Sequence, residues 1–225
     1  MEQAVARKNT LERSHKGWTQ VYETLQVDIL FGRALPRERL VEDDLIARFD
    51  ATRHAVRRAL DALEREGLVQ RQPNRGARVR DYSRKEVEDL YQIRTALEER
   101  AAALVPMPGD PAYVETLKTL AARHERASRE QRYLDLSRIN NEFHEALYAG
   151  AGNPELSAAI RHYSLMTQPI RSRGFSNSEL RETAIREHWQ MVSAIESGDR
   201  TALLQLCRVH IEGPKDYYLE TNPGL

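Results

Sequence analysis

The segment at residues 50–69, DATRHAVRRALDALEREGLV, constrains the fold of this 225-residue chain more than any other. Its apolar residues recur at helical spacing and predict one buried face: Val56, Ala59, Leu60 and Leu63. Thr52 suits the N-cap of such a helix, and Gly67 follows its end. The segment therefore predicts a short amphipathic helix with its polar face free for another role.

The flanking segments complete a small domain. Apolar periodicity predicts a helix from Trp18 to Gly32 and a second, shorter one that ends at Phe49. After the central helix, LVQRQ and ARVRDY alternate around PNRG, which indicates a β-hairpin. Three helices and a hairpin wing predict a winged helix-turn-helix at residues 18–80, after a polar tail at 1–17.

Beyond Tyr82 the strand signal disappears, and the fold class becomes mainly α. Ser83 and Glu86 form a capping box, and Asn153 with the following proline marks another helix start. Ser176 with Glu179 is a further predicted start. The predicted helices cover residues 83–105, 111–129, 132–149, 154–173, 179–197 and 200–219. We therefore expect an antiparallel all-α bundle of about six helices, at residues 83–220.

Composition limits the location of the protein. No run of 18 or more apolar residues is present, and the first residues lack the apolar core of a secretory signal. Cys207 is the single cysteine, so no internal disulfide can form, and we interpret it as a small core residue. These features predict a soluble, cytoplasmic protein with no membrane partner.

Charge is unevenly distributed although the formal net charge is zero. Residues 1–80 hold 16 Lys and Arg against 12 Asp and Glu, whereas the remainder hold 18 against 22. Within residues 53–80 the balance is eight basic to three acidic residues. A local basic excess of this kind is typical of surfaces that meet phosphate.

The polar face of the 52–65 helix suits the major groove of DNA. Arg53 and Arg57 lie one turn apart, and a guanidinium can bind guanine O6 and N7 bidentately. The helix N-terminus and the Thr52 hydroxyl suit a phosphate, and His54 projects from the same turn. Arg75 and Gly76 at the hairpin tip would approach the adjacent groove. The alternative is an exposed helix with ordinary arginines.

The stretch GRALPRERLVEDDLIARFDATRHAVRRALDALEREGLVQRQPNRGARV resembles the N-terminal domain of GntR-family transcription regulators. The resemblance implies that Thr52, Arg53 and Arg57 contact operator DNA and that the protein acts as a homodimer. His54 and Ala55 stand where the family often has Thr-Pro, which bears on base preference.

Arg94 lies on an apolar face of the helix predicted to begin at Ser83, and Leu90 and Leu97 lie on the same face. A buried guanidinium requires an anion, because an uncompensated buried charge is very costly. One interpretation pairs Arg94 with a carboxylate such as Glu98. The other assigns the anion to a bound carboxylate ligand.

Three histidines occupy inward positions on three predicted helices. His188 and His210 lie on apolar faces of their helices, and Asn140 precedes His144 by one turn. Any single inward histidine is usually a hydrogen-bonded core residue. Three together predict a divalent metal site, because imidazole nitrogen suits zinc and nickel.

The bundle also resembles the FadR C-terminal domain (FCD) class of GntR regulators, through IRTALEERAAALV, NNEFHEALYAGAGNPEL, IREHWQMVSAIESGD and CRVHI. The resemblance implies a metal held at Asn140, His144, His188 and His210, with asparagine in place of the usual aspartate. It also implies that Arg94 meets the carboxylate of an organic or amino acid effector.

The sequence thus predicts a transcription regulator and not an enzyme. Two other functions remain open at this point. One is a metal-dependent hydrolase using the three-histidine centre. The other is a helical partner-binding module with a structural metal and no effector.

Overall fold

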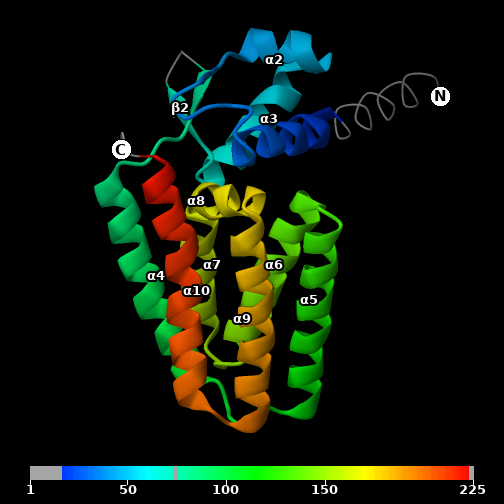
Figure 1. Cartoon of the computed structure of the whole chain (residues 1–225). Helices are drawn as coiled ribbons and strands as arrows, with labels where there is room; N and C mark the ends of the chain where they lie inside the picture. Colours follow the sequence, from blue (N-terminus) through cyan, green and yellow to red (C-terminus); the bar gives the residue numbers. More distant parts are fainter. Residues whose placement is uncertain (1–16, 73–75, 223–225) are drawn as a thin grey trace, which may run out of the picture. The chain divides into compact units, whose positions relative to one another are not determined.

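The computed structural model describes residues 17–72 and 76–222 (Figure 1). The chain divides into two compact units, Met1–Asp81 and Tyr82–Leu225. The predicted polar tail at 1–17 lies outside the described residues except for Gly17. Each unit has its own apolar core.

The N-terminal unit combines three helices with a small sheet. A first helix occupies residues 17–30, and the others are α2 (Glu42–Phe49) and α3 (Arg53–Arg65). Thr52 caps α3, because its side chain accepts a hydrogen bond from the Ala55 amide at 3.2 Å. The predicted winged helix-turn-helix is confirmed. The buried face of α3 comprises Ala55, Val56, Ala59, Leu60 and Leu63.

The sheet has one strand more than the predicted hairpin. Strands β2 (Val69–Gln72) and β3 (Gly76–Val79) pair antiparallel, and the two-residue strand β1 (Arg39–Leu40) adds to the other edge of β3. Such a short strand shows no alternation in the sequence. Its pairing rests on main-chain contacts, including the bond from the Val79 amide to the Glu38 carbonyl at 2.9 Å.

Gly76 has a structural reason to be glycine. Its φ is +78°, and a Cβ at this position would lie 2.7 Å from the Leu40 carbonyl oxygen. The close approach of β1 to β3 therefore depends on this residue.

The C-terminal unit is a bundle of long helices that run up and down beside one another (Figure 1). Among the described residues it comprises α4 (Arg84–Leu104), α5 (Pro111–Arg129), α6 (Tyr133–Ala149), α7 (Pro154–Met166), α8 (Gln168–Arg173), α9 (Ser178–Ser197) and α10 (Arg200–Thr221). The predicted mainly α fold class is confirmed. None of the described helices is long and apolar enough to span a bilayer.

Two local predictions for the bundle were wrong. The expected single helix at 154–173 breaks at Thr167, because Pro169 in the first turn of α8 has no N–H for a continuing helix. Helix α9 is capped by Asn177, whose side chain accepts from the Glu179 amide at 2.9 Å, and not by Ser176. The Ser176 hydroxyl instead donates to the Arg173 carbonyl.

Other local predictions held. Ser83 and Glu86 form the expected capping box, and Asn153 caps α7. Cys207 is fully buried in the bundle core, as predicted.

Candidate DNA interface and sensing site

The first turns of α3 present a polar, basic surface. Arg53, His54 and Arg57 are exposed, and the apolar face of the same helix is buried. The Thr52 side chain is exposed and already holds the Ala55 amide. The capping interaction therefore positions the N-terminus of α3, where the next amides can meet an anion.

Acidic residues in the first turn of α2 hold the arginines of α3. Arg53 lies 2.7 Å from Asp43, and Arg57 donates to Glu42 at 2.9 Å. Arg71 of β2 also approaches Glu42, at 3.7 Å. These contacts hold the guanidiniums of Arg53, Arg57 and Arg71 beside the first turn of α2. Both α3 side chains remain 53% exposed, so their partners can be exchanged for DNA at small cost.

The predicted wing residue Arg75 lies outside the described residues. Gly76 is described and opens β3. The predicted contact of Gly76 with DNA stays a prediction.

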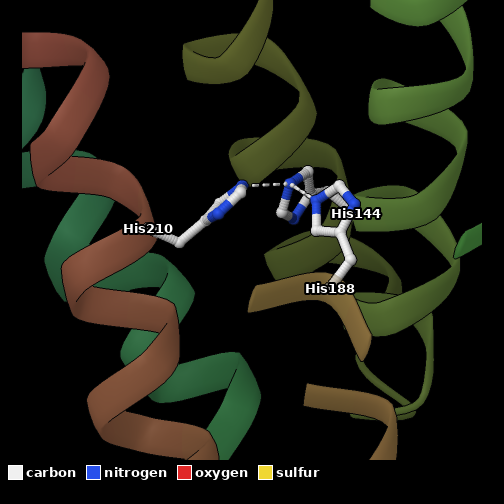
Figure 2. Close-up of side chains that lie close together, drawn as sticks. All are labelled: His144, His188 and His210. Carbon is white, nitrogen blue, oxygen red and sulfur yellow. Dashed lines mark hydrogen bonds between the residues drawn. The ribbon is translucent and has the colours of Figure 1, made fainter. Parts of the chain in front are cut away.

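The predicted histidines meet in one place inside the bundle. Figure 2 shows the rings of His144, His188 and His210, from α6, α9 and α10, turned toward one another. The His144 Nε2 lies 3.1 Å from that of His210 and 3.3 Å from that of His188. Ligand atoms of all three residues lie within 4.8 Å of one another. Tertiary packing therefore brings together nitrogens from residues that lie up to 66 positions apart in sequence.

Burial keeps two of these histidines neutral. It lowers the pKa of His144 and His188 well below the usual range, and neighbouring histidines lower it further. A neutral imidazole presents a nitrogen lone pair, as metal binding requires.

Glu187 orients the third histidine. Its carboxylate lies 2.6 Å from the His210 Nδ1. A proton on Nδ1 leaves the lone pair of His210 on Nε2, which faces the other two rings. Glu187 is thereby paired with His210.

Two of the three nitrogen separations fit a small divalent ion. Zinc binds imidazole nitrogen at about 2.0–2.1 Å, so ligands of a tetrahedral site lie about 3.3 Å apart. The two measured separations, 3.1 and 3.3 Å, match that edge. Asn140 lies one turn before His144, is buried, and lines a cavity together with His144 and His210. The donor set therefore suits the predicted metal.

Arg94 is buried as predicted, with 5% of its surface exposed. Its Nη2 and Nε bind Glu98 Oε1 at 2.7 and 2.9 Å, the pairing that the sequence left as one of two alternatives. Its Nη1 is buried without a hydrogen-bond partner among the described residues. Arg94, Asn140, His144 and His210 line one cavity of about 50 Å³. The ion pair therefore leaves part of the guanidinium available to a ligand.

The structure adds two residues that the sequence analysis missed. His124 of α5 is buried beside His188, with ring centroids 4.4 Å apart, and burial lowers its pKa to about 3. Leu117 and Ala121 precede His124 at helical spacing, so the apolar face that they form could have indicated an inward histidine. Arg171 of α8 also lines the cavity. Apolar periodicity did not predict Arg171 as an inward residue, because the helix break at Thr167 changes which positions of α8 face the interior.

Comparisons with known protein families assign both units. Residues 18–79 match the family described as bacterial regulatory proteins, gntR family. Residues 89–213, more than half of the chain, match the FCD domain.

Individual relatives agree with this assignment. The chain is 26% identical over 201 residues to YdhC of Bacillus subtilis, an uncharacterized HTH-type transcriptional regulator, covering 89% of this chain and 90% of that protein. It is also 26% identical to the HTH-type transcriptional repressor RspR of Escherichia coli, covering 86% and 85%. Relatives of this kind are transcription regulators and not enzymes.

The fold has solved counterparts. McbR/YncC of E. coli superposes with a TM-score of 0.71 at 20% identity, over 91% of this chain and 97% of that one. A GntR regulator from Rhodococcus sp. RHA1 superposes at 0.69 with 21% identity, over 90% and 97%. The chain belongs to the GntR family of bacterial regulators, in the class with an FCD domain, and is a DNA-binding transcription regulator.

Proposed function

We propose that a small carboxylate effector, bound together with a divalent metal ion in the C-terminal bundle, controls the affinity of this regulator for operator DNA. In this proposal residues 18–80 bind DNA, residues 83–220 sense the ligand, and the active species is a homodimer. The two heads of a dimer would read half-sites about one helical turn apart.

One observation supports the sensing role above all others. Three buried or half-buried imidazoles bring their Nε2 atoms close together, and a buried guanidinium with an unsatisfied N–H lines the cavity that His144 and His210 also line. A bundle that only needed stability would gain little from this arrangement, because buried polar groups are usually satisfied.

His144, His188 and His210 would hold the metal, with Asn140 as an additional oxygen ligand. The ion, zinc or nickel, would supply a localised positive charge that holds a carboxylate oxygen. Asparagine contributes no negative charge where the family often has aspartate, so we expect weaker metal affinity. Arg94 would bind the effector carboxylate through the N–H that Glu98 leaves free.

In the N-terminal unit, Arg53 and Arg57 would contact base edges in the major groove, with Thr52 and His54 near the phosphates. Arg75 and Gly76 would place the wing at the adjacent groove. Effector and DNA would influence each other reciprocally, with a coupling of roughly 1–3 kcal/mol in typical systems.

His188→Ala tests the metal site directly. The full-length protein would be incubated with zinc or nickel, desalted and submitted to elemental analysis. We expect about one metal ion per chain in the wild type and a large loss in the variant, because a central ligand is missing.

His162→Ala is the matched control, since His162 is an exposed histidine on α7. It should retain wild-type metal content. Equal metal in the wild type and in His188→Ala would refute the proposed site.

A further inference from the structure

Two buried arginines share the sensing cavity, but only one carboxylate among the described residues pairs with them. Arg94 and Arg171 are 5% and 9% exposed, and both line the cavity of about 50 Å³. The acceptors of Arg171 are neutral: the Asn141 side chain, and the carbonyl and hydroxyl oxygens of Ser164, each 3.0 Å from Nη2. One buried positive charge is therefore left without an ion-pair partner in the described chain.

Glu98 cannot serve as that partner without giving up other bonds. Its Oε1 accepts both bonds from Arg94, and its Oε2 accepts the Tyr148 hydroxyl at 2.8 Å. Both oxygens are thus engaged in the buried network. The second guanidinium remains uncompensated, although burying an unpaired charge costs several kcal/mol.

Both guanidiniums also keep unused donors. Arg94 Nη1 and Arg171 Nε are buried and have no hydrogen-bond partner within the described ranges. Three bonds hold Arg171 Nη2 to Asn141 and Ser164, so the guanidinium is fixed in place before any ligand arrives. Two fixed cations on the wall of one cavity favour a ligand with two anionic groups.

We propose that Arg171 is a second anion-binding residue of this cavity, and that the effector is a small dicarboxylate with one acid group for Arg94 and one for Arg171. This inference rests on the proposed function, because it refines the ligand of the same site.

The size of the cavity limits the ligand. A volume of about 50 Å³ holds roughly four water molecules, because one water requires about 10–15 Å³ on this measure. This small volume favours the shortest diacids over long chains.

The electrostatics of Arg171 agree with this assignment. Burial, and then the nearby charge of Arg94, lower the pKa of Arg171 to about 10. A bound anion between the two guanidiniums would relieve both effects.

The test compares acids matched in carbon number. Binding of malonate against propionate, and of succinate against butyrate, would be measured by calorimetry on the full-length, metal-loaded protein. We expect at least one diacid to bind about tenfold or more tightly than its monoacid, as one additional charge-assisted hydrogen bond provides.

Arg171→Gln should remove that preference, leaving the diacid with the affinity of the monoacid. Arg173→Gln is the matched control, because Arg173 lies on the same helix and does not line the cavity. If Arg171→Gln does not fold, Arg171→Lys and the wild-type ratio of diacid to monoacid affinity decide the question.

The outcomes separate this inference from the proposed function. Equal affinity for diacids and monoacids, or an unchanged preference in Arg171→Gln, overturns the role of Arg171 and leaves a single-acid effector site standing. If none of the four acids binds but His188→Ala loses metal, the small-diacid ligand is wrong while the metal site stands. If the wild type takes up no metal, the proposed function itself fails.

Discussion

The two units of this protein use arginine in opposite ways. Arg53 and Arg57 of the DNA-binding unit are 53% exposed and pair with acidic residues at the start of α2. Arg94 and Arg171 of the bundle are 5% and 9% exposed, and the one carboxylate that pairs with either of them among the described residues, Glu98, binds Arg94. The first pair of arginines therefore faces water, and the second pair faces the interior of its unit.

The difference decides what each arginine can do. An exposed ion pair contributes about 0–1 kcal/mol and is screened by salt, so a surface guanidinium can exchange its partner for DNA easily. A buried guanidinium loses hydration and must have a fixed anion, which makes its site selective. The DNA-binding unit thus suits reversible reading of a polyanion, and the bundle suits recognition of one small acid.

The largest expected effect comes from removing the carboxylate of the buried network. Glu98→Gln removes the ion-pair partner of Arg94 and leaves two buried guanidiniums without an anion, so the free energy of unfolding of the bundle should fall by about 3–5 kcal/mol. Urea unfolding followed by far-UV circular dichroism, without added acids, measures this loss.

Glu99→Gln provides the matched control. Glu99 is the adjacent residue on α4 and pairs with Arg208, which is 59% exposed. Its removal should cost less than about 1 kcal/mol. Similar losses in the two variants would show that the buried and exposed arginines do not differ as proposed.

A smaller effect is expected at the exposed arginines, and it should appear in binding. Arg57→Ala should weaken affinity for operator DNA, selected from random duplexes, by about 1–3 kcal/mol while leaving the unfolding free energy nearly unchanged. Fluorescence anisotropy with labelled duplex measures the affinity.

Arg65→Ala on the last turn of the same helix should bind DNA nearly as the wild type does. Arg65 is exposed there, and its Nε donates to the Asp61 carbonyl. An unchanged operator affinity in Arg57→Ala would contradict the assignment of α3 as the reading helix.

The smallest effect near neutral pH concerns Cys207, whose reactivity shows whether water reaches the core of the bundle. Burial raises the pKa of its thiol to about 12, against about 8.5 in an unfolded chain. At pH 8 the folded thiolate fraction is then about one in ten thousand, so a thiol reagent should react only on unfolding.

The sign of the pH dependence follows from the same shift. Above about pH 8.5 the unfolded thiol loses its proton while the folded one keeps it, so the folded state becomes less stable by up to about 1.4 kcal/mol per pH unit. Rapid labelling of the native protein at pH 8 would show that water reaches this part of the core.

Local features were predictable from the sequence wherever a signal acts over one or two turns. Such signals depend on neighbours within a few residues. They include the Thr52 cap, the capping box at Ser83 and the apolar helix faces that hold His188 and His210. Strand β1 escaped prediction, because two residues show no period and their pairing partner lies about 40 positions away.

The sequence alone therefore determined the two kinds of unit, and it indicated the proposed reading helix and the residue types of the proposed sensing site, because periodicity and capping are local properties of the chain. Only the tertiary structure decided that three imidazole nitrogens meet, that Glu98 takes Arg94, and that Arg171 reaches the same cavity. These outcomes depend on the rotation and height of one helix against another, which packing across the whole bundle sets.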